Sequence, residues 1–216
     1  MKLAAFKNHW GKASDKPSNF RSKDCSGDAA VTVKRITYVS LRQLLRHELI
    51  SGEDPGTEDL IHRLRHIKRA RGFSRDEFLA MCRWKSPRAM GRCRRNSAAT
   101  IRRISRAALA ARSERKRMNL LTSLRGVSVP MASAILTLVD PKRYGVLDIR
   151  VWQLLFAMNS VRTNPRGVGL NFKNWYHYLR KLRHHAREMD ISARTVERTL
   201  FAYHRKVQQG KIYEWP

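Results

Sequence analysis

The sequence predicts an all-α protein, and three observations carry that prediction. Apolar residues recur at helical spacing from residue 38 onward. Capping residues and Gly or Pro breaks separate these apolar stretches. A strand-like pattern occurs only at residues 30–36, and it is short.

Two regions are expected along the chain. Residues 1–35 are polar and basic without a sustained period, so we expect a basic arm or tail there. Residues 36–216 are expected to form one helical domain. Its first helix carries an apolar stripe formed by Leu41, Leu44, Leu45 and Leu49, and the residues that end this stripe are 51–56. The second begins at residues 57–59 with the acids Glu58 and Asp59 and ends at residues 69–72 with the bases Arg69 and Arg71, as the helix dipole favours.

The later helices are predicted from the same kinds of signal. Ser74 and Glu77 fit a capping box before a short helix. Ser97 begins a helix that carries Ile101, Ile104 and Ala108 on one side. Further helices are expected at about residues 115–125, 130–139, 148–158, 174–187 and 192–207.

The charge of the chain indicates a polyanionic partner. The chain has 216 residues and a formal net charge of +28. Between residues 62 and 117 there are nineteen Lys or Arg and three acids, a local balance of +16. Clustered arginine suits phosphate oxygens because each guanidinium offers a fork of donors. We therefore expect nucleic acid as the partner, with a solvated basic face or association with a ribosome or membrane as the alternative.

Cysteine usage and hydropathy suggest a location. Cys25, Cys82 and Cys93 make no paired framework, which indicates a reducing compartment. The longest uncharged apolar run, residues 129–139, is shorter than the roughly 20 residues that a membrane helix needs. Charges interrupt the start of the chain, so no secretory leader is predicted. We expect a cytoplasmic protein, nucleoid-associated in a bacterium, with no membrane partner and no obligate protein partner.

Residues 124–134 predict two helices joined by a tight glycine turn. Gly126 can adopt a positive φ and lets the backbone approach a ligand. Pro130 suits the first turn of the second helix, whose free N–H groups and dipole would favour an anion. An ordinary corner between two helices is the alternative. Contacts to DNA phosphate are expected at Arg125, Gly126, Val127, Ser128, Val129 and Met131.

Asp148 is the candidate catalytic residue. It lies in an apolar segment, residues 146–152, 22 positions after Gly126. One carboxylate can stabilise the positive charge that develops on a sugar as its base leaves, and can orient water. Apolar neighbours would exclude water and strengthen this effect. The alternative, a helix N-cap, is compatible with catalysis. Asp140 precedes Pro141 and fits a helix end better.

These two segments resemble the helix-hairpin-helix superfamily of DNA glycosylases. The hairpin of that family is matched by Leu124, Gly126, Val127 and Ala132 or Ala134, and its acid-bearing segment by residues 146–152. The resemblance covers roughly residues 115–160. It implies two helical lobes around a basic cleft, double-stranded DNA as the partner, and hydrolysis of the N-glycosidic bond of an extruded base with Asp148 as the essential acid.

Two departures from the family pattern limit the chemistry. Ser128 replaces the second hairpin glycine. Pro130 occupies the position at which bifunctional relatives carry a nucleophilic lysine, so no Schiff base can form there. No cysteine follows Cys93, so the iron–sulphur cluster of some relatives is not expected. No cofactor or metal is expected, although the resemblance allows a monovalent cation at the hairpin carbonyls.

An extruded base must be held between flat side chains. The candidates for this pocket are Trp84, Lys85, Tyr144 and Trp152. Residues 84–88 combine an aromatic and two bases in what we expect to be a helix-breaking loop, and a core tryptophan with solvated neighbours is the alternative. Lys85 is also a candidate amine nucleophile on proximity alone. Trp152 fits the core better. No zinc site is expected, because a fourth spaced ligand is lacking beside His177, His184 and His185.

The expected function is that of a monofunctional DNA glycosylase that leaves an abasic site. Two substrates stay open: an alkylated purine, as in base-excision repair, or a bulky modified pyrimidine such as glucosylated hydroxymethylcytosine of phage DNA, as in antiviral defence. The main alternative is a noncatalytic hairpin module that binds DNA. A third interpretation, an RNA-binding or ribosome-associated helical protein, leaves the spacing from Gly126 to Asp148 unexplained.

Overall fold

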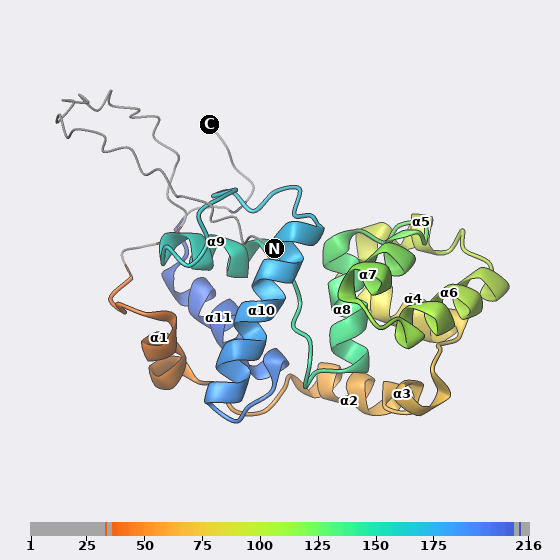
Figure 1. Ribbon diagram of the computed structural model, residues 1–216, viewed down its shortest axis with the longest axis horizontal. Coiled ribbons are helices and arrows are strands. Elements are labelled where there is room, and N and C mark those ends of the chain that lie inside the picture. The colour runs from red at the N-terminus through yellow and green to blue at the C-terminus, as the bar shows by residue number, and fades with distance from the viewer. Residues whose placement is uncertain (1–32, 34–35, 210–211, 213–216) are drawn as a thin grey trace, which may run out of the picture. The chain divides into compact units, whose positions relative to one another are not determined.

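The computed structural model describes residue 33, residues 36–209 and residue 212, and it confirms the all-α class for them (Figure 1). The predicted arm falls almost wholly outside the described residues. Of the strand-like segment at residues 30–36, Val33 forms only an isolated antiparallel bridge with Gln208. The described residues all belong to one compact unit, Val31–Pro216.

The first helices differ in detail from the prediction. In α1 (Leu41–Glu48) three leucines of the stripe are buried, but Leu49 lies after the helix and is 43% exposed. The predicted second helix is two helices, α2 (Pro55–Leu64) and α3 (Ile67–Ala70). They separate at Arg65, whose N–H bonds to the His62 carbonyl three residues back and so tightens the last turn.

The predicted capping box is present at the start of α4 (Arg75–Lys85). The expected loop at residues 84–88 is wrong for its first two residues, because α4 continues through Trp84 and ends at Lys85, with Ser86 as its C-cap. A 3₁₀ turn, η1 (Pro87–Ala89), and the short α5 (Met90–Cys93) follow. Ser97 caps α6 (Ala98–Ala110), and its predicted apolar side is buried.

The remaining helices agree with the prediction to within three residues at each end. They are α7 (Glu114–Thr122), α8 (Val129–Val139), α9 (Ile149–Ala157), α10 (Phe172–Glu188) and α11 (Ala193–Val207). Asp140 follows α8 directly, as expected of a helix end.

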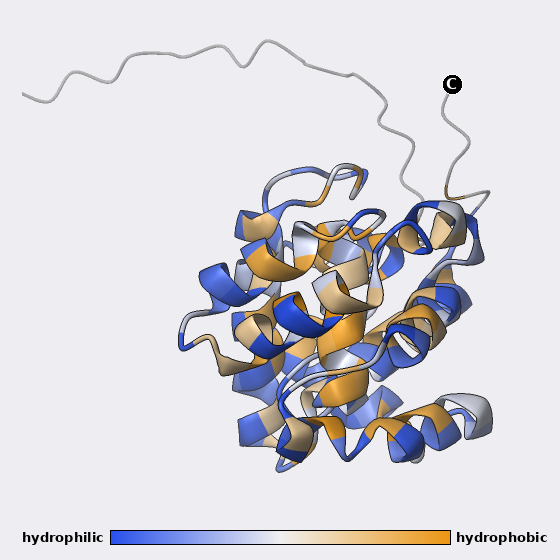
Figure 2. Ribbon diagram, turned by 90° about the vertical axis from the view of Figure 1, so that its right-hand side faces the viewer, coloured by the Kyte–Doolittle hydropathy of each residue, from blue (hydrophilic) through white to orange (hydrophobic). Residues whose placement is uncertain are grey.

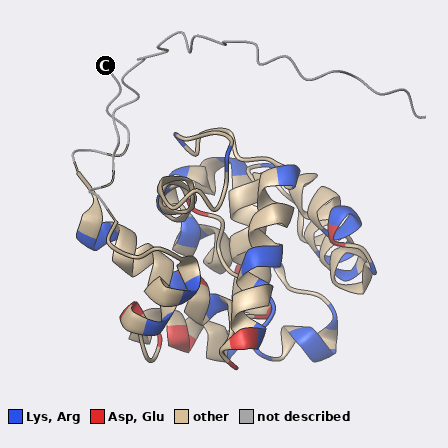
Figure 3. Ribbon diagram, turned by 60° about the vertical axis from the view of Figure 1, so that its left-hand side comes forward, with Lys and Arg blue, Asp and Glu red and all other residues tan. Residues whose placement is uncertain are grey.

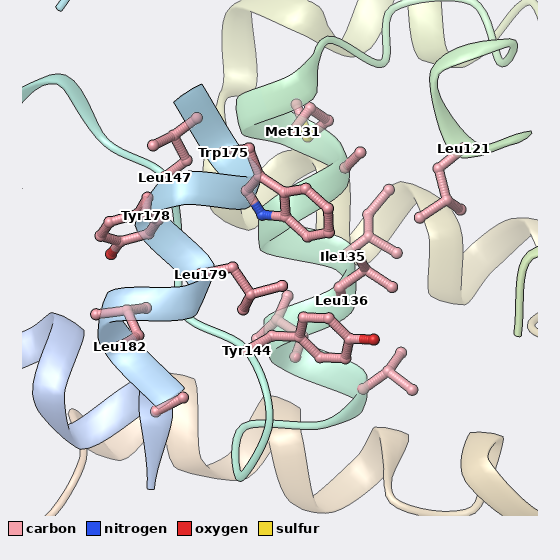
Figure 4. Packing of buried hydrophobic residues seen from close by; sticks show 14 of the residues in the cluster. Leu121, Met131, Ile135, Leu136, Tyr144, Leu147, Trp175, Tyr178, Leu179 and Leu182 are labelled. Atoms are coloured by element: carbon pink, nitrogen blue, oxygen red, sulfur yellow. The ribbon is translucent and has the colours of Figure 1, made fainter. Parts of the chain in front are cut away.

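The core is built around α8, in which every residue from Met131 to Val139 is buried. This helix packs against α2, α4, α7 and α10, whereas α11 packs against α1, α9 and α10. Trp175 and Leu179 of α10 point toward Ile135 on α8 (Figure 4). Hydrophobic and hydrophilic stretches alternate along most of the helices, and a largely hydrophobic helix lies in the middle of the view (Figure 2).

Basic residues occur on most of the helices, whereas the few acids gather mainly toward the lower edge of Figure 3. The α9–α10 connection and α5 both lie along the upper edge of Figure 1. The connection belongs to a basic segment of the chain, because no acid occurs between Asp148 and Glu188.

Candidate functional site

Asp148 caps the N-terminus of α9. Its Oδ1 accepts a hydrogen bond from the Arg150 N–H at 3.1 Å, and its backbone is extended. The predicted capping role is therefore confirmed. The residues just before it are fixed as well: the Leu147 N–H donates to Ser133 Oγ at 2.8 Å, and the Tyr178 hydroxyl donates to the Val146 carbonyl at 2.9 Å. A carboxylate on so constrained a backbone has a defined position.

Lys85 reaches Asp148 from the far end of α4. Its Nζ lies 2.6 Å from Asp148 Oδ2, and each of the two side chains is 20% exposed. The sequence separates them by 63 positions. The pair is thus largely shielded from solvent but remains accessible to it. The attraction between its two charges is therefore stronger than in a fully exposed pair.

A second charged cluster lies close to this pair, and sequence reasoning missed it. Arg194 of α11 forms ion pairs with the buried Glu197 and with Glu53, the latter at 2.8 Å. Burial raises the pKa of Glu197, and the nearby Arg194 and Lys85 act in the opposite direction. Asp148 adds to the upward shift, which shows that the two clusters influence each other.

Trp84 is held at one edge and covered on one side. Its Nε1 donates to Thr57 Oγ1 at 2.9 Å, and the Arg194 guanidinium lies 5.4 Å from the ring centroid. Trp84 is half-buried and directly precedes Lys85 in the chain, so its ring is not fully available for a base to stack on.

Two other proposed pocket residues lie in the core. Trp152 is 1% exposed and donates from Nε1 to the Asn164 carbonyl at 2.9 Å. Tyr144 is 4% exposed, and its hydroxyl donates to the Glu114 carboxylate at 3.0 Å. Burial raises the pKa of Tyr144. Neither ring is accessible to a base that enters from solvent in this structure.

The glycine turn before α8 has the predicted form. Gly126 has a φ of +81°, and a Cβ there would lie 2.9 Å from the backbone N and the Sγ of Cys93. The turn therefore packs directly on α5, so only glycine fits. Ser128 caps α8 and accepts from the Met131 N–H at 3.4 Å. Pro130 lies in the first turn, as expected.

Asn96 holds this turn to the end of α5, and no pattern in the sequence pointed to it. Its side-chain amide donates to the carbonyls of Arg125 at 2.9 Å and Cys93 at 2.8 Å, and its Oδ1 accepts from the Arg125 N–H at 2.9 Å. Asn96 is itself buried. The turn is consequently rigid.

The six expected DNA contacts differ in exposure in the structure. Arg125 and Ser128 are exposed, Gly126 and Val129 are half-buried, and the side chains of Val127 and Met131 are buried. The latter two could reach DNA only through their backbone, which corrects the expectation for their side chains. Four exposed arginines lie on the segment from η1 to just after α5, the helix on which the turn packs, namely Arg88, Arg92, Arg94 and Arg95.

A separate basic groove runs along the outer side of α10. Its volume is about 1010 Å³, and five of its residues are Lys142, Arg143, Arg180, Lys181 and Arg187. The ligand atoms of His184, His185 and Glu188 lie within 4.8 Å of one another beside it. The sequence analysis did not predict Glu188 as a metal ligand. The many surrounding cations favour an anion over a metal ion.

No protein-family model, curated protein or solved structure matches this chain. In the part of the chain that the structure describes, no helix has the length and apolar character needed to cross a membrane. A function can therefore be inferred only from the residues and their arrangement.

Proposed function

We propose that this protein is a monofunctional DNA glycosylase with Asp148 as its essential carboxylate. The observation that carries the proposal is the ion pair between Lys85 and a partly exposed Asp148 whose backbone is held in place. Asp148 lies 22 positions after the rigid turn at Gly126, which we propose binds a DNA phosphate. The net charge of +28 and the exposed arginines beside the turn support double-stranded DNA as the partner.

The proposed reaction is a hydrolysis. The bond between C1′ and the base nitrogen breaks, its electron pair leaves with the base, and the base takes up a proton. Positive charge then develops on the sugar, where the Asp148 carboxylate stabilises it. The oxygen of a water molecule bonds to C1′, and Asp148 orients that water and accepts its proton. The products are a free base and an abasic site.

Lys85 is proposed to hold the carboxylate in place. Its ammonium occupies Oδ2 while the Arg150 N–H occupies Oδ1, so both oxygens are directed by the protein. A preorganised charge of this kind needs no rearrangement as the reaction proceeds. The two proposed substrates are an alkylated purine and a bulky modified pyrimidine.

A noncatalytic DNA-binding module is the second candidate, and one observation favours it. Both Asp148 oxygens already have partners that account for the residue structurally, as a helix cap and as one half of an ion pair between α4 and α9. The two candidates agree on duplex DNA and differ on whether a base is released.

The test is base release from a panel of DNAs: alkylated, oxidised, uracil-containing, and hypermodified phage genomes. Each product is heated in alkali to convert abasic sites into breaks. We expect alkali-dependent breaks on one substrate, and their loss in Asp148→Asn, which keeps the size and capping ability of the side chain. Asp140→Asn is the matched control, because Asp140 pairs with Lys68 at the end of α8.

Three results would count against the proposal as stated. No release from any substrate, together with tight duplex binding, would favour the noncatalytic module. Unchanged release by Asp148→Asn would remove Asp148 from the chemistry. Breaks without alkali would indicate lyase chemistry, for which borohydride trapping of wild type and Lys85→Met would test the amine nearest to Asp148.

A further inference from the structure

The connection between α9 and α10 is a fixed structure that lies against the start of α9. Trp152 donates from Nε1 to the Asn164 carbonyl at 2.9 Å, and Gln153 donates from Nε2 to the Arg166 carbonyl at 3.1 Å. Within the connection, Asn164 donates from Nδ2 to the Val168 carbonyl at 2.7 Å. These side-chain bonds hold the backbone of the tip in one place.

The tip presents one large hydrophobic side chain to solvent. Val168 is 55% exposed and stands between Gly167 and Gly169, both of which have positive φ. Gly167 is buried, and a Cβ on it would lie 3.0 Å from Ile149 Cγ1. Since Ile149 follows Asp148 directly, the tip of the connection packs beside the start of the helix that Asp148 caps.

The charge around Val168 suits the backbone of a nucleic acid. Arg162 and Arg166 are exposed on the same connection, and the chain carries no acid from Ile149 to Arg187. Cations close to a protruding apolar group in the chain can hold phosphates while that group enters the stack of bases.

The other large hydrophobic side chains exposed in the described residues lack this combination. Val39 and Leu49 lie immediately outside the two ends of α1. Tyr176 is stacked on Phe172 at a centroid distance of 5.7 Å, so one face of its ring is occupied. Val168 alone among them stands on a fixed tip that packs against the residue after Asp148.

We propose that Val168 is a positioning residue that inserts into duplex DNA and fills the space left by the extruded nucleotide. This role rests on the proposed glycosylase function and adds to it a residue that acts on the duplex, away from the bond that breaks. Extruding a base costs the stacking and pairing of that base. An apolar side chain that replaces the lost stacking offsets part of this cost and keeps the nucleotide outside.

The test uses a probe that needs no chemistry. A duplex carries a tetrahydrofuran abasic-site analogue with 2-aminopurine as the neighbouring base, whose fluorescence rises when it loses its stacking. Wild type and Val168→Leu are expected to raise the fluorescence on binding, and Val168→Ala to lose most of that rise. Val39→Ala is the control, because that residue is 92% exposed and lies outside α1.

A second readout separates insertion from general damage to the fold. On a substrate base found in the panel above, Val168→Ala is expected to slow single-turnover release from paired duplex by about tenfold or more, while release from the same base in single-stranded DNA stays within about twofold of wild type. A base that is already unpaired needs no inserted side chain.

The proposal on Val168 would be overturned by an equal fluorescence rise and equal duplex rate in wild type and Val168→Ala. An equal slowing on duplex and single-stranded DNA would also overturn it, because that result indicates an altered Asp148 site. If wild type releases no base but Val168→Ala still loses the fluorescence rise, insertion stands while the glycosylase function fails.

Discussion

Replacing Asn96 by alanine should loosen the turn at Gly126 and lower the stability of the whole unit. The buried side chain makes three hydrogen bonds, two to Arg125 and one to Cys93. At about 1 kcal/mol for each bond, their loss should lower the free energy of unfolding by about 3 kcal/mol. For a chain of this size, the melting temperature should then fall by roughly 6–12 °C.

Urea denaturation would measure this change, with duplex binding at fixed salt as the second readout. We expect Asn96→Ala to weaken duplex binding at temperatures where the variant is still folded, because the turn no longer presents its N–H groups rigidly. Asn119→Ala on the exposed side of α7 is the control and should change stability by no more than about 0.5 kcal/mol. A loss below about 1 kcal/mol in Asn96→Ala would refute the reasoning, since water would then replace the three bonds.

Two further predictions concern packing and pH. Gly145→Ala should lower the free energy of unfolding by about 2 kcal/mol in urea, because the new Cβ would lie 2.5 Å from Leu182 Cδ1 and 2.8 Å from Glu197 Cβ. His204 is buried, and burial lowers its pKa to about 4, below its usual 6.5. Its neutral form is therefore favoured in the folded state, so stability should fall by about 3 kcal/mol as the pH falls from 6.5 to 4, and His204→Leu should lack this part of the pH dependence in urea titrations.

Matched variants make both predictions decisive. Gly91→Ala adds a Cβ where no atom lies within 4 Å, so it should be neutral or slightly stabilising. If Gly145→Ala behaves like Gly91→Ala, the close approach at Gly145 is wrong. For the pH prediction, the exposed His62 offers the control His62→Gln. An equal pH slope in wild type and His204→Leu would show that other groups cause the acid sensitivity.

The sequence predicted most helices because their signals are local. Apolar spacing located α6, α8, α10 and α11, and the caps at Ser74 and Ser97 located the starts of α4 and α6. The error at residues 84–88 has a local cause as well. Proline restricts the residue before it, Ser86, but leaves the two residues before that free to stay helical.

The candidate site was predictable only in part. Asp148 and Gly126 could be singled out because each has a local chemical reason, an acid in an apolar segment and a glycine between helices. The partners that fix them come from far away in the chain: Lys85 reaches Asp148 across 63 positions, and Asn96 reaches Arg125 across 29. No periodicity encodes such pairs, because tertiary packing creates them.

The segment that leads to Asp148 has no regular structure of its own, yet its backbone is bonded to three helices. The carbonyls of Pro141 and Lys142 accept from the first N–H groups of α11, the Val146 carbonyl accepts from α10, and the Leu147 N–H donates to α8. The turn at Gly126 is held instead by Cys93 of α5 and by Asn96, which follows that helix. Release of α11 would thus displace Asp148 while the turn kept its form, so partial unfolding should separate the two elements that the proposed function needs together.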